Sequence, residues 1–266
     1  MNEDQCNVLN NIMTKALNYV ITQTKPDDIT ARKMKNEIHS IMMHDRANGA
    51  MALGFIAAVE GDYEESLKQN KLALTLGKDA SLYINYAVSM RALGHNAEAY
   101  VIINQAMNLV SDITQAIDIF MAIAFNAGHF EKTQSLEDSF KRQEQTKLIN
   151  YLQPYFDDVN TVLNQAQLPY DTHVHIAAIK ERIRLNNHHG YTEHKLETLN
   201  NKLYHWSLVN GDAETIALMN TQLEDELSQL KYTVFDSYHV AFKAKEWPTT
   251  PLDPEPPLAQ IKSVYE

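Results

Sequence analysis

Apolar and polar residues alternate along most of this chain with the period of an α-helix. Between residues 4 and 23 the apolar positions recur at intervals of three and four residues, which is the stripe of an amphipathic helix. A break at Pro26 follows, and a second stripe of the same kind runs to about residue 42. Similar stripes continue to about residue 165, so we expect the N-terminal part to consist of packed helices.

A short phrase that begins with glycine recurs between these stripes. It reads GDYEES from Gly61, GHNAEA from Gly94 and GHFEKT from Gly128, and the three glycines are 33 and then 34 residues apart. Each glycine lies between two apolar stripes, so it is predicted to turn one helix into the next. Twelve residues after each glycine stands a small or aromatic residue: Ala73, Ala106 and Phe140.

This pattern, from about residue 47 to 143, resembles the tetratricopeptide repeat (TPR) family. The resemblance implies three helix–turn–helix repeats in residues 47–147, stacked in a right-handed solenoid, with residues 1–46 as a capping helix pair. It also assigns the large apolar position of each first helix to Leu53, Tyr86 and Phe120. We therefore expect these three side chains to be buried between helices.

In the TPR family the first helices line a groove that holds a segment of another protein. The resemblance therefore implies a partner-binding groove, and we expect it to prefer an apolar or amphipathic segment, with Arg91 and Asp118 setting its polarity. The alternative is that the same side chains pack against neighbouring helices or against the C-terminal part of the chain. The residues at the matching positions are Met51, Phe55, Ile84, Asn85, Val88, Arg91, Asp118, Ala122 and Phe125.

The pattern changes after the last repeat. Residues 148–187 continue as connecting helices, and Pro154 is expected to kink or split the first of them. Within residues 188–246, apolar and polar residues alternate on both sides of Asn200-Asn201, which predicts two strands joined by a hairpin turn. A helix that opens near Asp212 and a third strand within 232–244 follow. This order predicts a small α+β domain with helices on one face of a mixed sheet.

The last segment, residues 247–266, holds five of the eight prolines and is predicted to be extended. Its apolar residues favour docking on the body of the protein, with Trp247 as the anchor, or across a second copy of the chain. Such a tail could also occupy the repeat groove until a partner displaces it. The predicted fold class is thus α+β: an N-terminal right-handed, TPR-like α-helical solenoid, then a small α+β domain with a mixed sheet, and a proline-rich tail.

Charge and cysteine content exclude several classes of function. The net charge is −11, and no stretch carries the clustered Lys and Arg that a nucleic-acid-binding surface needs. Cys6 is the only cysteine, so no internal disulfide can form, which suits a reducing cytoplasm. We find no secretory signal and no apolar run near the roughly 20 residues of a membrane helix. We expect a bacterial, cytoplasmic protein that binds neither nucleic acid nor membrane.

Histidine is the main candidate for chemistry, because seven of the 11 histidines lie between His173 and His239. The pairs His173/His175 and His188/His189, with Asp171 nearby, offer metal-ligand types. However, no third ligand stands at a supporting spacing, and on one helix His173 and His175 would point about 200° apart. We therefore expect no metal and no cofactor. No nucleophile or phosphate-binding motif is present, so no catalytic residue is assigned.

These observations favour a non-enzymatic interaction protein, an adaptor, chaperone or regulator that binds another protein or peptide segment. Two alternatives remain open. One is an enzyme with a His-rich active site in the C-terminal α+β domain, to which the repeats bring the substrate. The other is an acidic inhibitor or antitoxin-like protein that covers a basic site on its target. Association with a second copy of the chain is also open.

Overall fold

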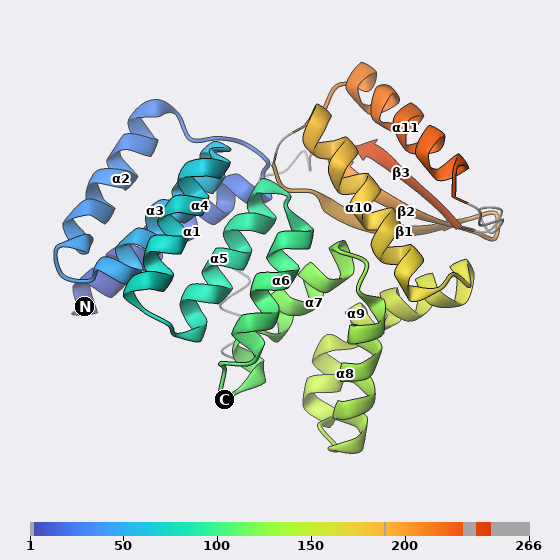
Figure 1. Cartoon of the computed structure of the whole chain (residues 1–266), viewed down its shortest axis with the longest axis horizontal. Helices are drawn as coiled ribbons and strands as arrows, with labels where there is room; N and C mark the ends of the chain where they lie inside the picture. The colour runs from blue at the N-terminus through green and yellow to red at the C-terminus, as the bar shows by residue number, and fades with distance from the viewer. Residues whose placement is uncertain (1–2, 189, 231–237, 246–266) are drawn as a thin grey trace.

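The computed structural model describes residues 3–188, 190–230 and 238–245 (Figure 1). His189, residues 232–237 of the expected third strand, and the tail from 247 to 266 with Trp247 lie outside the described residues. The helices are α1 Glu3–Ile21, α2 Asp28–Met42, α3 Arg46–Glu60, α4 Tyr63–Leu76, α5 Ala80–Leu93, α6 Asn96–Met107, α7 Ile117–Asn126, α8 Phe130–Arg142, α9 Thr146–Ala166, α10 Tyr170–Asn187 and α11 Ala213–Ser228. The strands are β1 Glu193–Leu199, β2 Lys202–Val209 and β3 Tyr238–Ala244, and a short 3-10 helix, η1 Ile113–Gln115, precedes α7.

The three glycines of the recurring phrase each lie at a tight turn between two helices. Gly61 follows α3, Gly94 follows α5 and Gly128 lies between α7 and α8. Their φ angles are 86°, 84° and 76°, in the left-handed region that glycine adopts without the strain of a side chain. The prediction that each glycine turns one helix into the next is confirmed.

One apolar core extends through the helices from α1 to α9. Leu53, Tyr86 and Phe120 are buried in it, which confirms their predicted burial. Helix α3 is buried on all sides from residue 49 to 59. A helix that is apolar all round is found inside a protein, and α3 is packed among α1, α2, α4 and α5.

Pro154 does not split its helix. Helix α9 continues through it from Thr146 to Ala166, so that part of the prediction is wrong. A proline inside a helix removes one backbone hydrogen bond and costs about 3 kcal/mol. Pro154 is exposed, whereas Leu152 before it and Phe156 after it are fully buried. Apolar packing on both sides of Pro154 offsets the cost of the lost hydrogen bond.

The three strands form one mixed sheet in the order β1-β2-β3. β1 and β2 are antiparallel and joined at Asn200-Asn201, whose φ angles of 51° and 62° fit the predicted hairpin turn. β3 is parallel to β2 and reaches that position through α11. Ile183 of α10 and Leu223 of α11 pack with Phe242 on the same face of the sheet. The predicted mixed sheet with helices on one face is confirmed.

Helix α10 fixes the sheet against the turns of the helical part (Figure 1). The Arg184 guanidinium donates a 2.7 Å hydrogen bond to the Gly94 carbonyl, and the backbone of Gly128 lies directly against the carbonyl of His173. At the other end of the sheet, Lys245 Nζ donates to the Ile21 carbonyl at 3.0 Å. Helix α10 and the residue that follows β3 therefore both contact the helical part.

The length and composition of a helix decide whether it could cross a membrane. Among the described helices, none is both long and apolar enough to cross a membrane. The fold class is α+β in the coarse sense, mostly helical with one small mixed sheet.

Candidate functional site

The residues predicted to line the groove differ in burial. Met51 and Phe55 are buried in α3, among neighbouring helices. Phe125 is also buried, and its ring centroid lies 5.4 Å from that of Phe130 and 5.3 Å from that of His205. For these three residues, packing within the protein explains the burial of the side chain.

The other predicted groove residues are half-buried and lie on α5 and α7. Ile84, Val88 and Arg91 are four and three residues apart on α5, so they share one face of that helix. Asn85 is half-buried beside them, but its side chain donates to the carbonyl of Ser81 in its own helix. Asp118 on α7 is half-buried, and so is Ala122 one turn later. These side chains keep surface that a partner could cover.

The charged residues of this face have aromatic neighbours. Arg91 donates a 3.0 Å hydrogen bond to the Tyr191 hydroxyl, and its guanidinium lies 5.0 Å from the centre of the Tyr191 ring. Tyr151 donates to Asp118 Oδ2 at 2.7 Å. Burial raises the pKa of Asp118 above its ordinary value, although the Tyr151 hydrogen bond opposes this. Tyr155 lies near both charges, since Asp118 raises its pKa and Arg91 lowers it, after the larger effect of burial.

Each of the two charged side chains has one polar atom without a partner. In the described part of the chain, Arg91 Nε and Asp118 Oδ1 are buried and make no hydrogen bond. One is a donor and the other an acceptor. A buried polar atom without a partner costs about 1–3 kcal/mol, so both atoms favour a ligand that completes them.

Sequence reasoning missed the three tyrosines of this face. Tyr151 and Tyr155 are four residues apart on α9, beside the apolar stripe that the sequence analysis followed, and that spacing was the signal that could have found them. Tyr191 precedes β1, in a segment expected to be the start of a strand. No local pattern links it to Arg91, which is 100 residues away in the chain.

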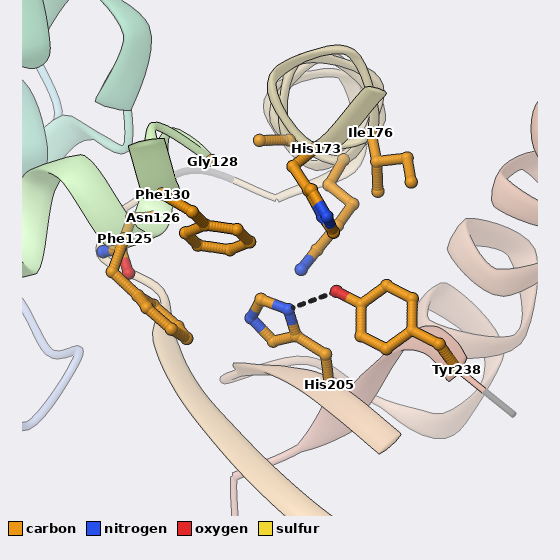
Figure 2. A pocket seen from close by; sticks show the side chains of 10 residues that line it. Phe125, Asn126, Gly128, Phe130, His173, Ile176, His205 and Tyr238 are labelled. Atoms are coloured by element: carbon orange, nitrogen blue, oxygen red, sulfur yellow. Dashed lines mark hydrogen bonds between the residues drawn. The ribbon is translucent and has the colours of Figure 1, made fainter. Parts of the chain in front are cut away.

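A second cluster of polar side chains lies between α10 and the inner face of the sheet. His205 Nε2 lies 3.0 Å from His194 Nδ1, and His205 Nδ1 lies 2.9 Å from the Tyr238 hydroxyl (Figure 2). Burial, followed by the charge of Lys180, lowers the pKa of both histidines well below the ordinary value. Burial alone lowers the pKa of His173 to about 4. These histidines are therefore neutral near pH 7.

His173 and His205 line a small cavity. Figure 2 shows Phe125 and Phe130 on one side of it, His173 and Ile176 on α10, and His205 and Tyr238 on the sheet. The cavity volume is about 10 Å³, which is close to the space that one water molecule needs. That volume suits a water molecule or a small ion.

Lys180 lines this cavity and is the most unusual ionisable group of the cluster. Its side chain is buried, with 6% exposure, and among the described residues its ammonium makes no hydrogen bond and no ion pair. Burial lowers its pKa to about 7. Lys180 was not predicted as a candidate, although its place between Ile176 and Ile183 puts a lysine on the apolar stripe of α10, which was the available signal.

His173 and His175, the first pair considered as metal ligands, are not brought together. His173 is buried whereas His175, two residues later in α10, is exposed. Within residues 3–188, 190–230 and 238–245, no three His, Cys, Asp or Glu side chains gather as a metal site would require. His189 lies outside these ranges.

Comparison with known proteins assigns a role to neither site. No protein-family model, curated protein or solved structure matches the chain. The face formed by α5, α7 and α9 offers half-exposed apolar and charged groups. In the cluster around Lys180 the histidines are neutral near pH 7, and the adjoining cavity is only about 10 Å³ in volume. The first suits a macromolecular partner, and the second suits a species no larger than a small ion or water.

Proposed function

We propose that this chain is an interaction protein, an adaptor, chaperone or regulator, whose TPR-like helical solenoid binds a segment of a partner protein. The regular spacing of Gly61, Gly94 and Gly128 and their left-handed turns support the repeat assignment. The proposed groove consists of Ile84, Val88, Arg91, Asp118 and Ala122, with Tyr151, Tyr155 and Tyr191 around its charged residues. Asn85, Met51, Phe55 and Phe125 support the groove and do not contact the partner in this proposal.

The observation that carries the proposal is the pair of unpartnered atoms in the groove. Arg91 Nε needs an acceptor and Asp118 Oδ1 needs a donor. A peptide group, or the amide of Asn or Gln, provides one of each. We therefore infer that the partner segment is apolar or amphipathic, packs on Ile84 and Val88, and presents polar groups to the half-buried side chains of Arg91 and Asp118.

Site-specific photo-crosslinking in the native host tests this function. A photoreactive residue at Val88 or Ala122 should capture the partner, whereas the same residue at Val101, on α6 and 59% exposed, should not. A peptide that spans the captured segment should then bind the purified protein, and Asp118→Ala or Arg91→Ala should weaken it at least tenfold. Equal capture from Val88 and Val101, or unchanged peptide affinity in both variants, would overturn the proposal.

One observation favours a second candidate, an enzyme centred on the His-rich cluster. A buried lysine with a pKa near 7 is a form that catalytic lysines take. It ranks second because the adjoining cavity is only about 10 Å³ in volume. Treatment with a small aldehyde and then borohydride distinguishes the two, because only an accessible, neutral Lys180 would be alkylated ahead of exposed lysines. The acidic-inhibitor alternative predicts binding that weakens steeply with salt, which the peptide titration also measures.

A further inference from the structure

A second cavity adjoins the first, and Lys180 lines both. Its volume is also about 10 Å³. Lys180 and Arg184 of α10, Thr192 before β1, and Ser207 of β2 contribute to its wall. All four side chains are at least nine-tenths buried.

Three of these side chains have polar groups that nothing in the described chain satisfies. Thr192 Oγ1 and Ser207 Oγ are buried and have no hydrogen-bond partner. The Lys180 ammonium has neither a hydrogen bond nor an ion pair there. Each hydroxyl and the ammonium can donate a hydrogen bond, so three donors line one small cavity.

The charges around the cavity are unevenly balanced. Arg184 donates to backbone carbonyls, at 2.7 Å to Gly94 and 2.7 Å to Gly190, so no carboxylate forms an ion pair with it in the described chain. Glu181 is the acidic residue of the wall, and its carboxylate accepts from the Ala97 amide at 3.1 Å. His194 is neutral because of its burial. Two cations therefore face one anion.

We propose that this second cavity binds a small monovalent anion of the size of chloride, held by the Lys180 ammonium and the hydroxyls of Thr192 and Ser207. A buried ammonium without a counter-charge is costly, and an anion supplies both the charge and an acceptor for the three donors. The volume excludes phosphate and sulfate. The bound anion would join α10, the start of β1 and β2 at one point.

The protonation of Lys180 then sets the affinity. The titratable and charged groups that face it are His173, Glu181 and Arg184 on α10, His194 on β1, His205 on β2 and Tyr238 on β3. The histidines stay neutral above their lowered pKa, so between pH 6 and 9 the lysine is the group that changes charge. With its pKa at about 7, about 90% of the anion-free protein carries this charge at pH 6 and about 1% at pH 9. The apparent affinity should fall about a hundredfold between them.

Thermal unfolding of the full chain in sodium chloride, against sodium gluconate at equal ionic strength, tests the site. At pH 6 the unfolding midpoint should rise with chloride and level off as the site fills, and the response should shift to about a hundredfold higher chloride at pH 9. Lys180→Met should abolish the chloride response. Ser207→Ala and Thr192→Val should each weaken it, which keeps the test decisive if one variant folds poorly. Lys132→Met, an exposed lysine of α8, is the matched control.

A crystal grown in bromide gives the direct readout. An anomalous peak between Lys180, Thr192 and Ser207 is expected, and it should be absent in Lys180→Met. Sulfate should raise the unfolding midpoints of the wild-type protein and Lys180→Met equally and without levelling off, as a salt excluded from the protein surface does. A water in place of bromide, or a chloride response that Lys180→Met retains, would overturn the proposal.

Discussion

Helices α3 and α10 are both buried, but by different means. From residue 49 to 59, α3 buries only apolar and small residues, and each neighbour is another helix. α10 buries Ile176, Ile179 and Ile183 together with four polar residues, which are Thr172, His173, Lys180 and Arg184. Apolar burial stabilises the fold without regard to geometry or pH. Polar burial is favourable only where partners and charge states are fixed.

The two regions should therefore be sensitive to different kinds of change. The region around α3 should respond to the volume of a side chain and little to solution conditions. The region around α10 should respond to pH, to close approaches of the backbone, and to small ions.

Removal of a ring from the apolar region should have the largest effect. Phe55 is 1% exposed in the core of α3, so Phe55→Ala should lower the free energy of unfolding by about 3–5 kcal/mol. The loss should be the same at pH 5 and pH 7, because its cause is lost apolar packing, which does not depend on charge. Urea unfolding at both pH values measures it. A loss below about 1 kcal/mol would show that α3 is not packed as described.

The turn glycines give the next contrast, because residues of α10 lie directly against two of them. A Cβ at Gly128 would lie 2.4 Å from the His173 carbonyl oxygen, and one at Gly61 would lie 2.9 Å from the flexible end of Lys25. Left-handed strain costs about 1–2 kcal/mol at either glycine. Gly128→Ala should cost about 1–3 kcal/mol more than Gly61→Ala, because backbone must move. Equal losses by urea unfolding would show that α10 does not restrict this turn.

The sequence predicted the region around α3 better than the region around α10. Helix periodicity and the spacing of the glycines depend on residues close in the chain, and they located the turns, the core positions of Leu53, Tyr86 and Phe120, and the hairpin. The contacts of Arg184 with Gly94 and of Arg91 with Tyr191 join residues about a hundred positions apart, and no local pattern records them. Of the proposed groove, the sequence named the half-exposed residues on α5 and α7 but not their tyrosine neighbours.

Acid should weaken the α10 region selectively. The pKa of His173 is about 4 in the folded protein, below its ordinary 6.5, so between these values the unfolded chain binds the extra proton. Stability is therefore complete above pH 6.5 and falls as the pH drops towards 4, by up to about 3 kcal/mol from this residue. His194 and His205 act in the same direction.

His173→Phe offers the matched test, because it keeps an aromatic ring against Phe130, whose centroid is 4.9 Å away. The variant should show a shallower loss of unfolding free energy between pH 6.5 and 4 than the wild-type protein. An exposed control, His175→Phe in the same helix, should leave the slope unchanged. Identical slopes in all three proteins would mean that His173 is not held neutral by burial.

Substitutions in the proposed groove should have the smallest effect on stability and the largest effect on binding. Asp118→Asn keeps an acceptor for the Tyr151 hydroxyl. It removes the charge of a carboxyl group whose pKa is already raised by burial. The free energy of unfolding should therefore change by less than about 0.5 kcal/mol. Arg91→Lys keeps the charge but loses Nε and the planar contact with Tyr191. In a calorimetric titration, both variants should bind the partner segment about tenfold more weakly than the wild-type protein does. Their urea unfolding midpoints should stay near that of the wild-type protein. If either change instead lowered stability by more than about 2 kcal/mol, Arg91 and Asp118 would be structural residues like Arg184, and the polar atoms in the groove would need no partner from another protein.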